Sequence, residues 1–352
     1  MTEENLSQTQ PEQPEKPKKP VKPKRDPRAK LYKPETPLIL SSSPHFHSPN
    51  TVPKIMWNVI FALVPTTIMA LYYFHWSGVG LILSSVIAAL ASEMIVNRIK
   101  GESFTVGDGS AAITGLLLAL TLPPTFSMGG AALGSVFAII VGKHVFGGLG
   151  YNVFNPALLG RAFLQASFPV PMTTWAWPLT AKYAEVDGIT AATPLGLFKF
   201  EHVNSALHGL IYGNIGGSLG ETSAIAILVG GIYLLIRKYA DWRIPLSFLL
   251  SVFVVSGIFW LISPDIYPSP VFHLFSGGLM LGAFFMATDM VSSPVTAKGS
   301  WIFGVGCGFV LFIIRLFGVL PEGVMYSILL MNAFTPLINR YTRPDFFGEV
   351  RA

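Results

Sequence analysis

This chain is poor in cysteine and in charged residues. Its 352 residues include one cysteine, Cys307, and only 12% are Asp, Glu, Lys or Arg. A single cysteine excludes a disulfide framework and any iron–sulfur site built from cysteines within the chain. Ordinary soluble domains carry about 25% charged residues, so this charged fraction beside 51% hydrophobic residues is typical of a membrane protein.

Motifs of soluble redox domains are also lacking. No Gly-x-Gly-x-x-Gly follows a strand-like run, so no dinucleotide-binding domain is predicted. The histidines are scattered, and none are spaced to place two metal ligands on one helix face. We therefore expect no metal site, no NAD or ferredoxin site and no catalytic residue in this chain.

Apolar runs long enough to cross a membrane recur from Lys54 onward. The third run ends at Pro123-Pro124 and the fifth opens at Asn155-Pro156, and both are short for a bilayer core of about 30 Å. About ten spans are predicted: Lys54–Phe74, Gly78–Asn97, Gly109–Leu122, Gly129–Phe146, Pro156–Phe168, Leu219–Lys238, Ile244–Ile262, Phe272–Val291, Trp301–Phe317 and Val324–Ile338.

The distribution of basic residues predicts the orientation. Residues 1–37 form a Pro- and Lys-rich arm, which we expect to be disordered and to touch anionic lipid or partner subunits rather than nucleic acid. The long segment 169–218 contains only Lys182 and Lys199 as basic residues. The positive-inside rule therefore predicts both termini in the cytoplasm and residues 169–218 as a loop on the outer face.

A weak internal repeat predicts the architecture. Asn155-Pro156 through Arg161 is similar to Thr335-Pro336 through Arg340. An odd number of spans in each half requires the halves to be inverted relative to each other. The predicted fold is an all-α polytopic membrane protein with two inverted five-helix repeats that contain broken or short helices. The first repeat covers residues 38–168, the second 219–340, and a cytoplasmic tail covers 341–352.

A polar window over residues 186–195 lies in the longest gap between apolar spans. Small residues at Gly188, Ala191 and Ala192 leave room for a bulky group, and Pro194 fixes the backbone directly after Thr193. By composition alone, this window is also typical of an ordinary surface turn.

Three motifs carry a family resemblance. Asp187-x-x-Thr190-Ala191-Ala192-Thr193 resembles the flavinylation signature Asp-x-x-(Ser/Thr)-Gly-Ala-(Ser/Thr), with Ala191 where Gly is usual. The stretch from Gly142 to Phe163 and the motif Leu120–Pro124 resemble the NqrB/RnfD family. The resemblance runs from about Ala29 to Arg351, and the length favours the D-subunit branch of that family over the longer B subunits.

The resemblance implies an electron-carrying subunit of a bacterial cell-membrane complex that passes electrons between ferredoxin and NAD and moves Na⁺ or H⁺. Thr193 would be joined to FMN by a phosphoester, and Asp187 and Thr190 would be read by a flavin transferase outside the membrane. Ala192 would be a further residue of the cofactor-binding motif. Partner subunits would carry iron–sulfur clusters and a further flavin. Whether this chain also holds a second, non-covalent flavin such as riboflavin stays open.

Polar residues inside predicted spans are functional candidates because burying them is costly. Glu93, Asp108 and Asp289 are candidates for a cation path, although acids are also recruited as helix caps and Glu93 is in reach of Arg98. Arg161 is expected to contact a phosphate or a carboxylate, or to extend to the interface.

A solute channel or secondary transporter without a cofactor is the alternative, since inverted repeats with broken helices also build those proteins. The segment 169–218 discriminates the two, because a transporter has little need for the Asp187–Thr193 motif.

Overall fold

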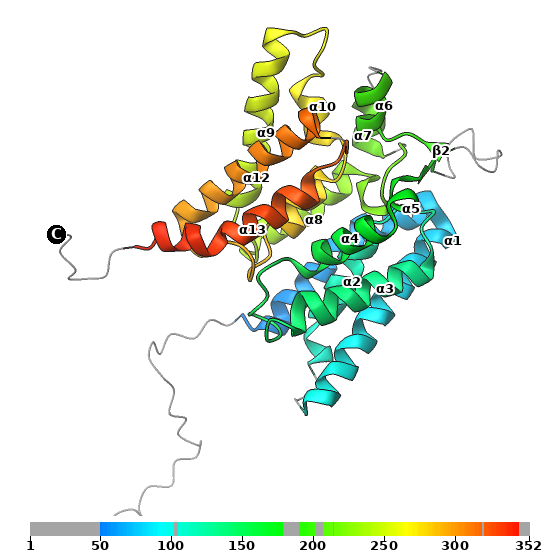
Figure 1. Cartoon of the computed structure of the whole chain (residues 1–352), viewed down its shortest axis with the longest axis vertical. Coiled ribbons are helices and arrows are strands. Elements are labelled where there is room, and N and C mark those ends of the chain that lie inside the picture. Colours follow the sequence, from blue (N-terminus) through cyan, green and yellow to red (C-terminus); the bar gives the residue numbers. More distant parts are fainter. Residues whose placement is uncertain are drawn as a thin grey trace, which may run out of the picture. The chain divides into compact units, whose positions relative to one another are not determined.

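The computed structural model describes residues 50–101, 105–178, 190–201, 207–213, 215–318 and 320–344. The predicted arm over 1–37 and Asp187 lie outside the described residues. Residues Asn50–Ala352 belong to one compact unit, in which the described part is helical, as predicted (Figure 1). Among the described residues, one two-stranded sheet pairs β1 (Trp175–Ala176) with β2 (Thr190–Ala191).

The first helix, α1 (Val52–Lys100), contains the first two predicted spans. It breaks at His75, whose φ of 43° and ψ of −124° are not helical. In the described part, α1, α9 (Arg243–Ile262) and α12 (Ala297–Phe317) are long and apolar enough to cross a membrane.

The remaining helices are shorter. Each predicted span overlaps a helix, but ten membrane crossings and two inverted repeats are not confirmed by these bounds and stay a prediction. The shorter helices are α2 (Ser110–Leu120), α3 (Met128–Ile139), α4 (Pro156–Ser167), α5 (Pro169–Thr173), α6 (Pro194–Glu201), α7 (Leu207–Tyr212), α8 (Ala224–Ile236), α10 (Pro270–Phe275), α11 (Leu279–Leu281) and α13 (Val324–Tyr341). Two π-helical turns, Ile140–His144 and Gly282–Met286, follow α3 and α11.

Prolines and polar caps set several helix boundaries. Pro53, Pro156 and Pro270 stand in the first turns of their helices, where a missing N–H costs nothing. The Asn155 side chain accepts hydrogen bonds from the Ala157 and Leu158 amides, and its Nδ2 donates to the Met286 carbonyl at 3.1 Å. The start of α4 is thereby joined to the π-helical turn of the second half.

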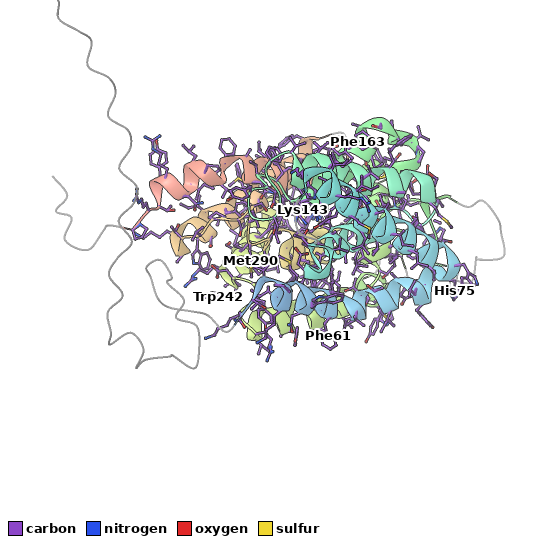
Figure 2. The ribbon with its side chains drawn as sticks, turned by 90° about the horizontal axis from the view of Figure 1, so that it is seen from below. Phe61, His75, Lys143, Phe163, Trp242 and Met290 are labelled. Carbon is purple, nitrogen blue, oxygen red and sulfur yellow. The ribbon has the colours of Figure 1, made fainter. Side chains whose placement is uncertain are left out.

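The short helix α2 lies at the centre of the first half. Every residue of α2 except Ala112 is buried, and the helix contacts α1, α3 and α4. Charged Lys143 also lies in the interior, whereas apolar Phe61 and Trp242 lie at the periphery (Figure 2). An apolar periphery around a partly polar interior is the distribution that a lipid environment favours.

The two halves meet where α1 contacts α8 and where α4 contacts α13. At the first contact, Gly230 of α8 lies against the backbone of α1, and a Cβ there would collide with the Ala62 carbonyl oxygen. Small residues at helix contacts allow this close backbone approach inside membranes.

Candidate functional site

Thr193 is the N-cap of helix α6. Its Oγ1 accepts a hydrogen bond from the Gly196 amide at 3.1 Å, and its carbonyl accepts one from the Leu197 amide at 2.8 Å. Pro194 then occupies the first helical position, which suits its fixed φ. The side-chain oxygen therefore points to a helix N-terminus, where partial positive charge favours an anionic group.

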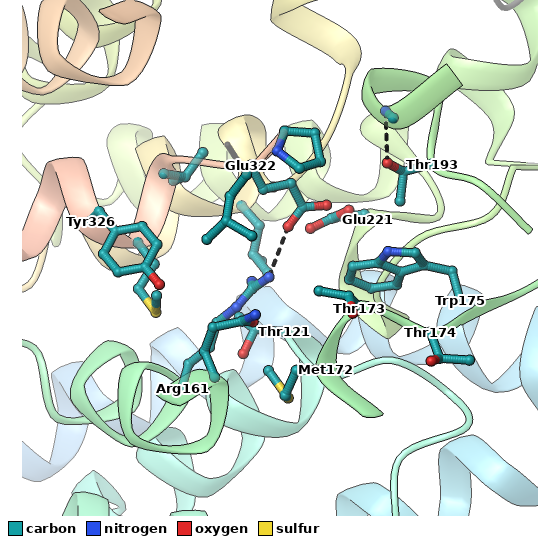
Figure 3. A pocket seen from close by; sticks show the side chains of 18 of the residues that line it. Thr121, Arg161, Met172, Thr173, Thr174, Trp175, Thr193, Glu221, Glu322 and Tyr326 are labelled. Atoms are coloured by element: carbon teal, nitrogen blue, oxygen red, sulfur yellow. Dashed lines mark hydrogen bonds and ion pairs between the residues drawn. The ribbon is translucent and has the colours of Figure 1, made fainter. Parts of the chain in front are cut away.

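A cavity of about 650 Å³ opens beside Thr193 (Figure 3). Ligand sites in proteins commonly have volumes of about 300–1,000 Å³ and mostly apolar walls with a few polar groups. The walls come from α4, α5, α6, α11 and α13, from β1, and from turns and connecting segments. They include Thr121, Leu158, Arg161, Gln165, Met172, Thr174, Trp175, Ala192, Thr193, Phe200, Glu201, Glu221, Met286, Glu322, Met325 and Tyr326.

The structure brings part of the predicted flavin motif to this cavity. Ala192 and Thr193 both line it, and Thr193 is only 3% exposed. Thr190 lies in β2, where it pairs with Ala176 of β1. The backbone pairing thus holds the start of the described motif beside the segment that carries Trp175.

Two aromatic residues of the 169–218 segment, Trp175 and Phe198, lie in different surroundings. Trp175 lines the cavity, whereas Phe198 packs on Phe272 with ring centroids 5.9 Å apart. Phe200 and Tyr326 line it as well, and the sequence analysis did not single them out. Helical spacing could have identified Phe200, because it lies about two turns beyond Thr193 on α6 and so on the same face.

An ion pair crosses one wall of the cavity. Arg161 Nη2 donates to Glu322 Oε2 at 2.8 Å, and the two side chains are 11% and 15% exposed. The expectation that Arg161 contacts a carboxylate is confirmed. Glu322 was not among the sequence-based candidates because it lies between two predicted spans. A carboxylate there is expected to be in water and so is not unusual.

A second carboxylate, Glu221, lines the same cavity and is also absent from the sequence-based candidates. It falls inside the predicted span Leu219–Lys238, so the rule that flagged Glu93 also applies to it. Glu221 ends a 3₁₀ turn, Leu219–Glu221, directly before α8.

Lys199 fixes α6 to the end of α12. Its Nζ donates to the carbonyl oxygens of Arg315 at 3.0 Å and Leu320 at 3.4 Å, and also to that of Gly318. These carbonyls lie at a helix C-terminus, where a cation is favourable. Partial burial lowers the pKa of the Lys199 ammonium below its ordinary value. The helix that begins at Thr193 is thus held against the segment that carries Glu322.

The predicted ion-path residues Glu93 and Asp108 belong to one polar network elsewhere in the first half. Both Glu93 oxygens accept from Lys143 Nζ, at 2.9 and 2.8 Å, so Glu93 neither reaches the interface nor pairs with Arg98, the two alternatives that the sequence left open. Lys143 also donates to Ser110 Oγ, which in turn donates to Asp108 Oδ1. Sequence spacing pointed to Arg98 because it lies on the same helix, but the π-helical turn after α3 carries Lys143 inward.

Asp289 lines a small cavity of about 90 Å³ that Ser110 and Lys143 also line. It accepts a hydrogen bond from Ser292 Oγ at 2.8 Å. The described residues contain no group of three His, Cys, Asp or Glu arranged to hold a metal ion. Glu93, Asp108 and Asp289 are therefore connected through Lys143, Ser110 and one cavity rather than clustered as ligands.

Comparison with known proteins identifies the family. Residues 39–348 match the NQR2, RnfD, RnfE family, and the chain belongs to it. Together with its apolar helices, this membership makes the chain a membrane protein.

Three relatives are similar to this chain over nearly their whole length. The chain is 45% identical over 322 residues to the D subunit of the proton-translocating ferredoxin:NAD(+) oxidoreductase complex of Clostridium ljungdahlii, covering 89% of this chain and 96% of the relative. It is 46% identical over 322 residues to the D subunit of the Na(+)-translocating ferredoxin:NAD(+) oxidoreductase complex of Acetobacterium woodii, covering 90% and 97%. Identity to the D subunit of the ion-translocating oxidoreductase complex of Escherichia coli is 38%, covering 88% and 98%.

Proposed function

We propose that this chain is the D subunit of a bacterial membrane complex that couples electron flow between ferredoxin and NAD to ion translocation, and that it carries covalent FMN on Thr193. Family membership and the names of the relatives support the first part. One of these relatives is named for protons and the other for Na⁺ at nearly equal identity, so identity alone does not select the ion.

The observation that carries the second part is the position of the Thr193 hydroxyl. It lies at the N-terminus of α6 and on the wall of a cavity large enough for a ligand. A phosphoryl group on Oγ1 is stabilised there by the helix N-terminus, and Trp175, Phe200 and Tyr326 offer aromatic surface for a ring system. FMN would supply the electron-transfer chemistry, while the protein supplies position and electrostatics.

The proposal includes the predicted topology. Two inverted five-helix repeats and cytoplasmic termini put the Asp187–Thr193 motif on the outer face, where a flavin transferase would reach it. Partner proteins with iron–sulfur clusters and a further flavin would deliver and accept the electrons, because the single cysteine of this chain cannot hold such a cluster.

The proposed ion path runs through the acids around the small cavity. Asp289 and Lys143 share this cavity, and Lys143 joins it to Glu93 and Asp108 through the hydrogen bonds described above. Neutralising each carboxylate in the reconstituted complex and measuring coupled cation transport tests this role. Unchanged transport in all three variants would remove it.

Flavin attachment is tested on denatured protein from a host that makes the transferase. The purified chain should show ultraviolet-excited flavin fluorescence on a denaturing gel. Thr193→Ala should abolish the fluorescence, whereas Thr190→Ala should retain it. A wild-type chain without fluorescence would favour the solute channel or transporter instead.

A further inference from the structure

The carboxyl group of Glu221 is buried in the cavity wall without a full set of partners. Glu221 is only 8% exposed, and its Oε1 has no hydrogen-bond partner among the described residues. That oxygen lies 2.9 Å from where a Cβ on Gly278 would be, so a side chain at position 278 would push the carboxyl group aside. A buried carboxylate oxygen without a donor is costly in its charged form.

Two arginines, Arg161 and Arg315, interact electrostatically with Glu221, but their hydrogen bonds go to other groups. Arg161 donates to Glu322 Oε2 at 2.8 Å, which commits it to the other carboxylate. Arg315 donates to the carbonyls of His273 at 2.7 Å and Ser276 at 2.8 Å, which caps the end of α10.

The Glu322 carboxylate lies near Glu221 on the same cavity wall (Figure 3), and two like charges at short range repel each other. The two acids lie over adjoining residues, because a Cβ on Gly277 would be 3.8 Å from Glu322 Cγ. It would also be 3.5 Å from Arg315 Nη2. Among the described residues, Glu201 of α6 is the remaining acid on the cavity wall, and it is exposed.

The formal charges of Arg161, Arg315, Glu221 and Glu322 sum to zero when all four are ionised. Any added negative charge in the cavity then leaves an excess in a site of low dielectric, where charge imbalance is expensive. Glu221 is the group that can remove this excess by binding a proton, since Glu322 is already stabilised by Arg161.

We propose that Glu221 is the proton-binding group of this cavity and takes up one proton from water when an electron enters the cavity. The inference rests on the proposed flavin site. With FMN bound, each electron that a reductant delivers to the cavity would be matched by one O–H bond formed at the Glu221 carboxyl. The proton would come from water, which leaves hydroxide in the bulk, and the electron and proton together would add no net charge to the cavity. The reaction links electron arrival to proton uptake at a residue of this chain.

Infrared difference spectroscopy tests the proposal on the purified complex in lipid, with dithionite as the reductant. Reduced-minus-oxidised spectra should contain a positive C=O stretching band of a carboxylic acid, and this band should shift in ²H₂O. Glu221→Gln should abolish the band, and Glu221→Asp should shift it. Glu201→Gln, which changes an exposed acid of the same cavity, should leave it in place.

Two results would overturn the inference: a band that persists in Glu221→Gln, or no band in a wild-type complex whose flavin is reduced by dithionite. The Glu221→Asp variant keeps the test available if Glu221→Gln does not assemble. Absence of covalent flavin in the wild-type chain would instead overturn the proposed function, so the two failures are distinguishable.

Discussion

Arg161 of α4 and Glu322, which precedes α13, form an ion pair of 2.8 Å between residues that lie 161 positions apart. The pair joins the first half of the chain to the second across the wall of the cavity that contains Thr193. It therefore bears on both the stability of the chain and the electrostatics of the proposed flavin site.

A double-mutant cycle measures this pair. Arg161→Met and Glu322→Gln should each destabilise the protein, and the double variant should lose less than the sum, with a coupling of about 0.5–3 kcal/mol. Thermal unfolding of the purified protein in detergent gives the values. Arg98→Met is the control, because Arg98 is exposed and surface changes usually stay within about 0.5 kcal/mol. Strictly additive losses would show that the pair contributes nothing.

Replacing Thr193 separates its two roles. Asn is as good an N-cap as Ser but cannot form a phosphoester, so Thr193→Asn should keep the stability of α6 and lose the flavin. Thr193→Ser should keep both, and Thr193→Ala should lose both, with a capping loss of about 1 kcal/mol. Flavin fluorescence and thermal unfolding are the two measurements. Flavin retained in Thr193→Asn would place the attachment elsewhere.

Lys143 and Glu93 should depend strongly on each other, since their side chains are 3% and 0% exposed. Removing one partner of a buried pair typically costs about 3–5 kcal/mol, because the other charge is left buried and unpaired. Lys143→Met should therefore be severely destabilising, and adding Glu93→Gln should restore much of the loss. Unfolding experiments on the three variants measure this, and a double variant less stable than Lys143→Met would contradict it.

Gly230 should not tolerate a side chain. A Cβ at this position meets the Ala62 carbonyl, so Gly230→Ala should separate α8 from α1 and cost about 1–3 kcal/mol by overpacking. Gly129→Ala is the matched control, because nothing lies within 4 Å of a Cβ on that exposed helical residue. Thermal unfolding compares the two, and equal stability of both variants would show that α1 and α8 are not in close contact.

Lys199 should make the free energy of unfolding depend on pH in the alkaline range. Burial lowers its pKa in the folded protein, so the unfolded chain binds the proton more tightly. The free energy of unfolding should therefore rise, relative to that of Lys199→Met, as the pH increases from the folded-state pKa toward the ordinary lysine value. Denaturant unfolding across this range measures the difference. A relative fall in stability over the same range would contradict the burial of the ammonium.

The positions of the long helices could be predicted from the sequence because each consists of a long run of apolar residues. Apolar runs with Pro or Gly at their ends placed α9, α12 and the two halves of α1 within a few residues. The break at His75 lies in the short gap between the first two predicted spans. The two-residue pairing of β1 with β2 left no pattern that periodicity could detect.

Residues of the cavity wall could be singled out from the sequence only where a contiguous motif or a charge inside an apolar run marks them. Ala192 and Thr193 were found because the motif is contiguous, and both line the cavity. Glu221 and Glu322 come from segments about a hundred residues apart, and which carboxylate receives Arg161 depends on the packing of α4 against the second half. Lys143 was missed as the partner of Glu93 for the same reason, since its position depends on the packing of α3 against α1.

The central claim is most directly tested by the intact mass of the chain, purified from a host that makes the flavin transferase. The account predicts a mass greater than that of the polypeptide by one FMN less one water, with the added mass on the peptide that contains Thr193. A chain with the mass of the unmodified polypeptide would contradict it.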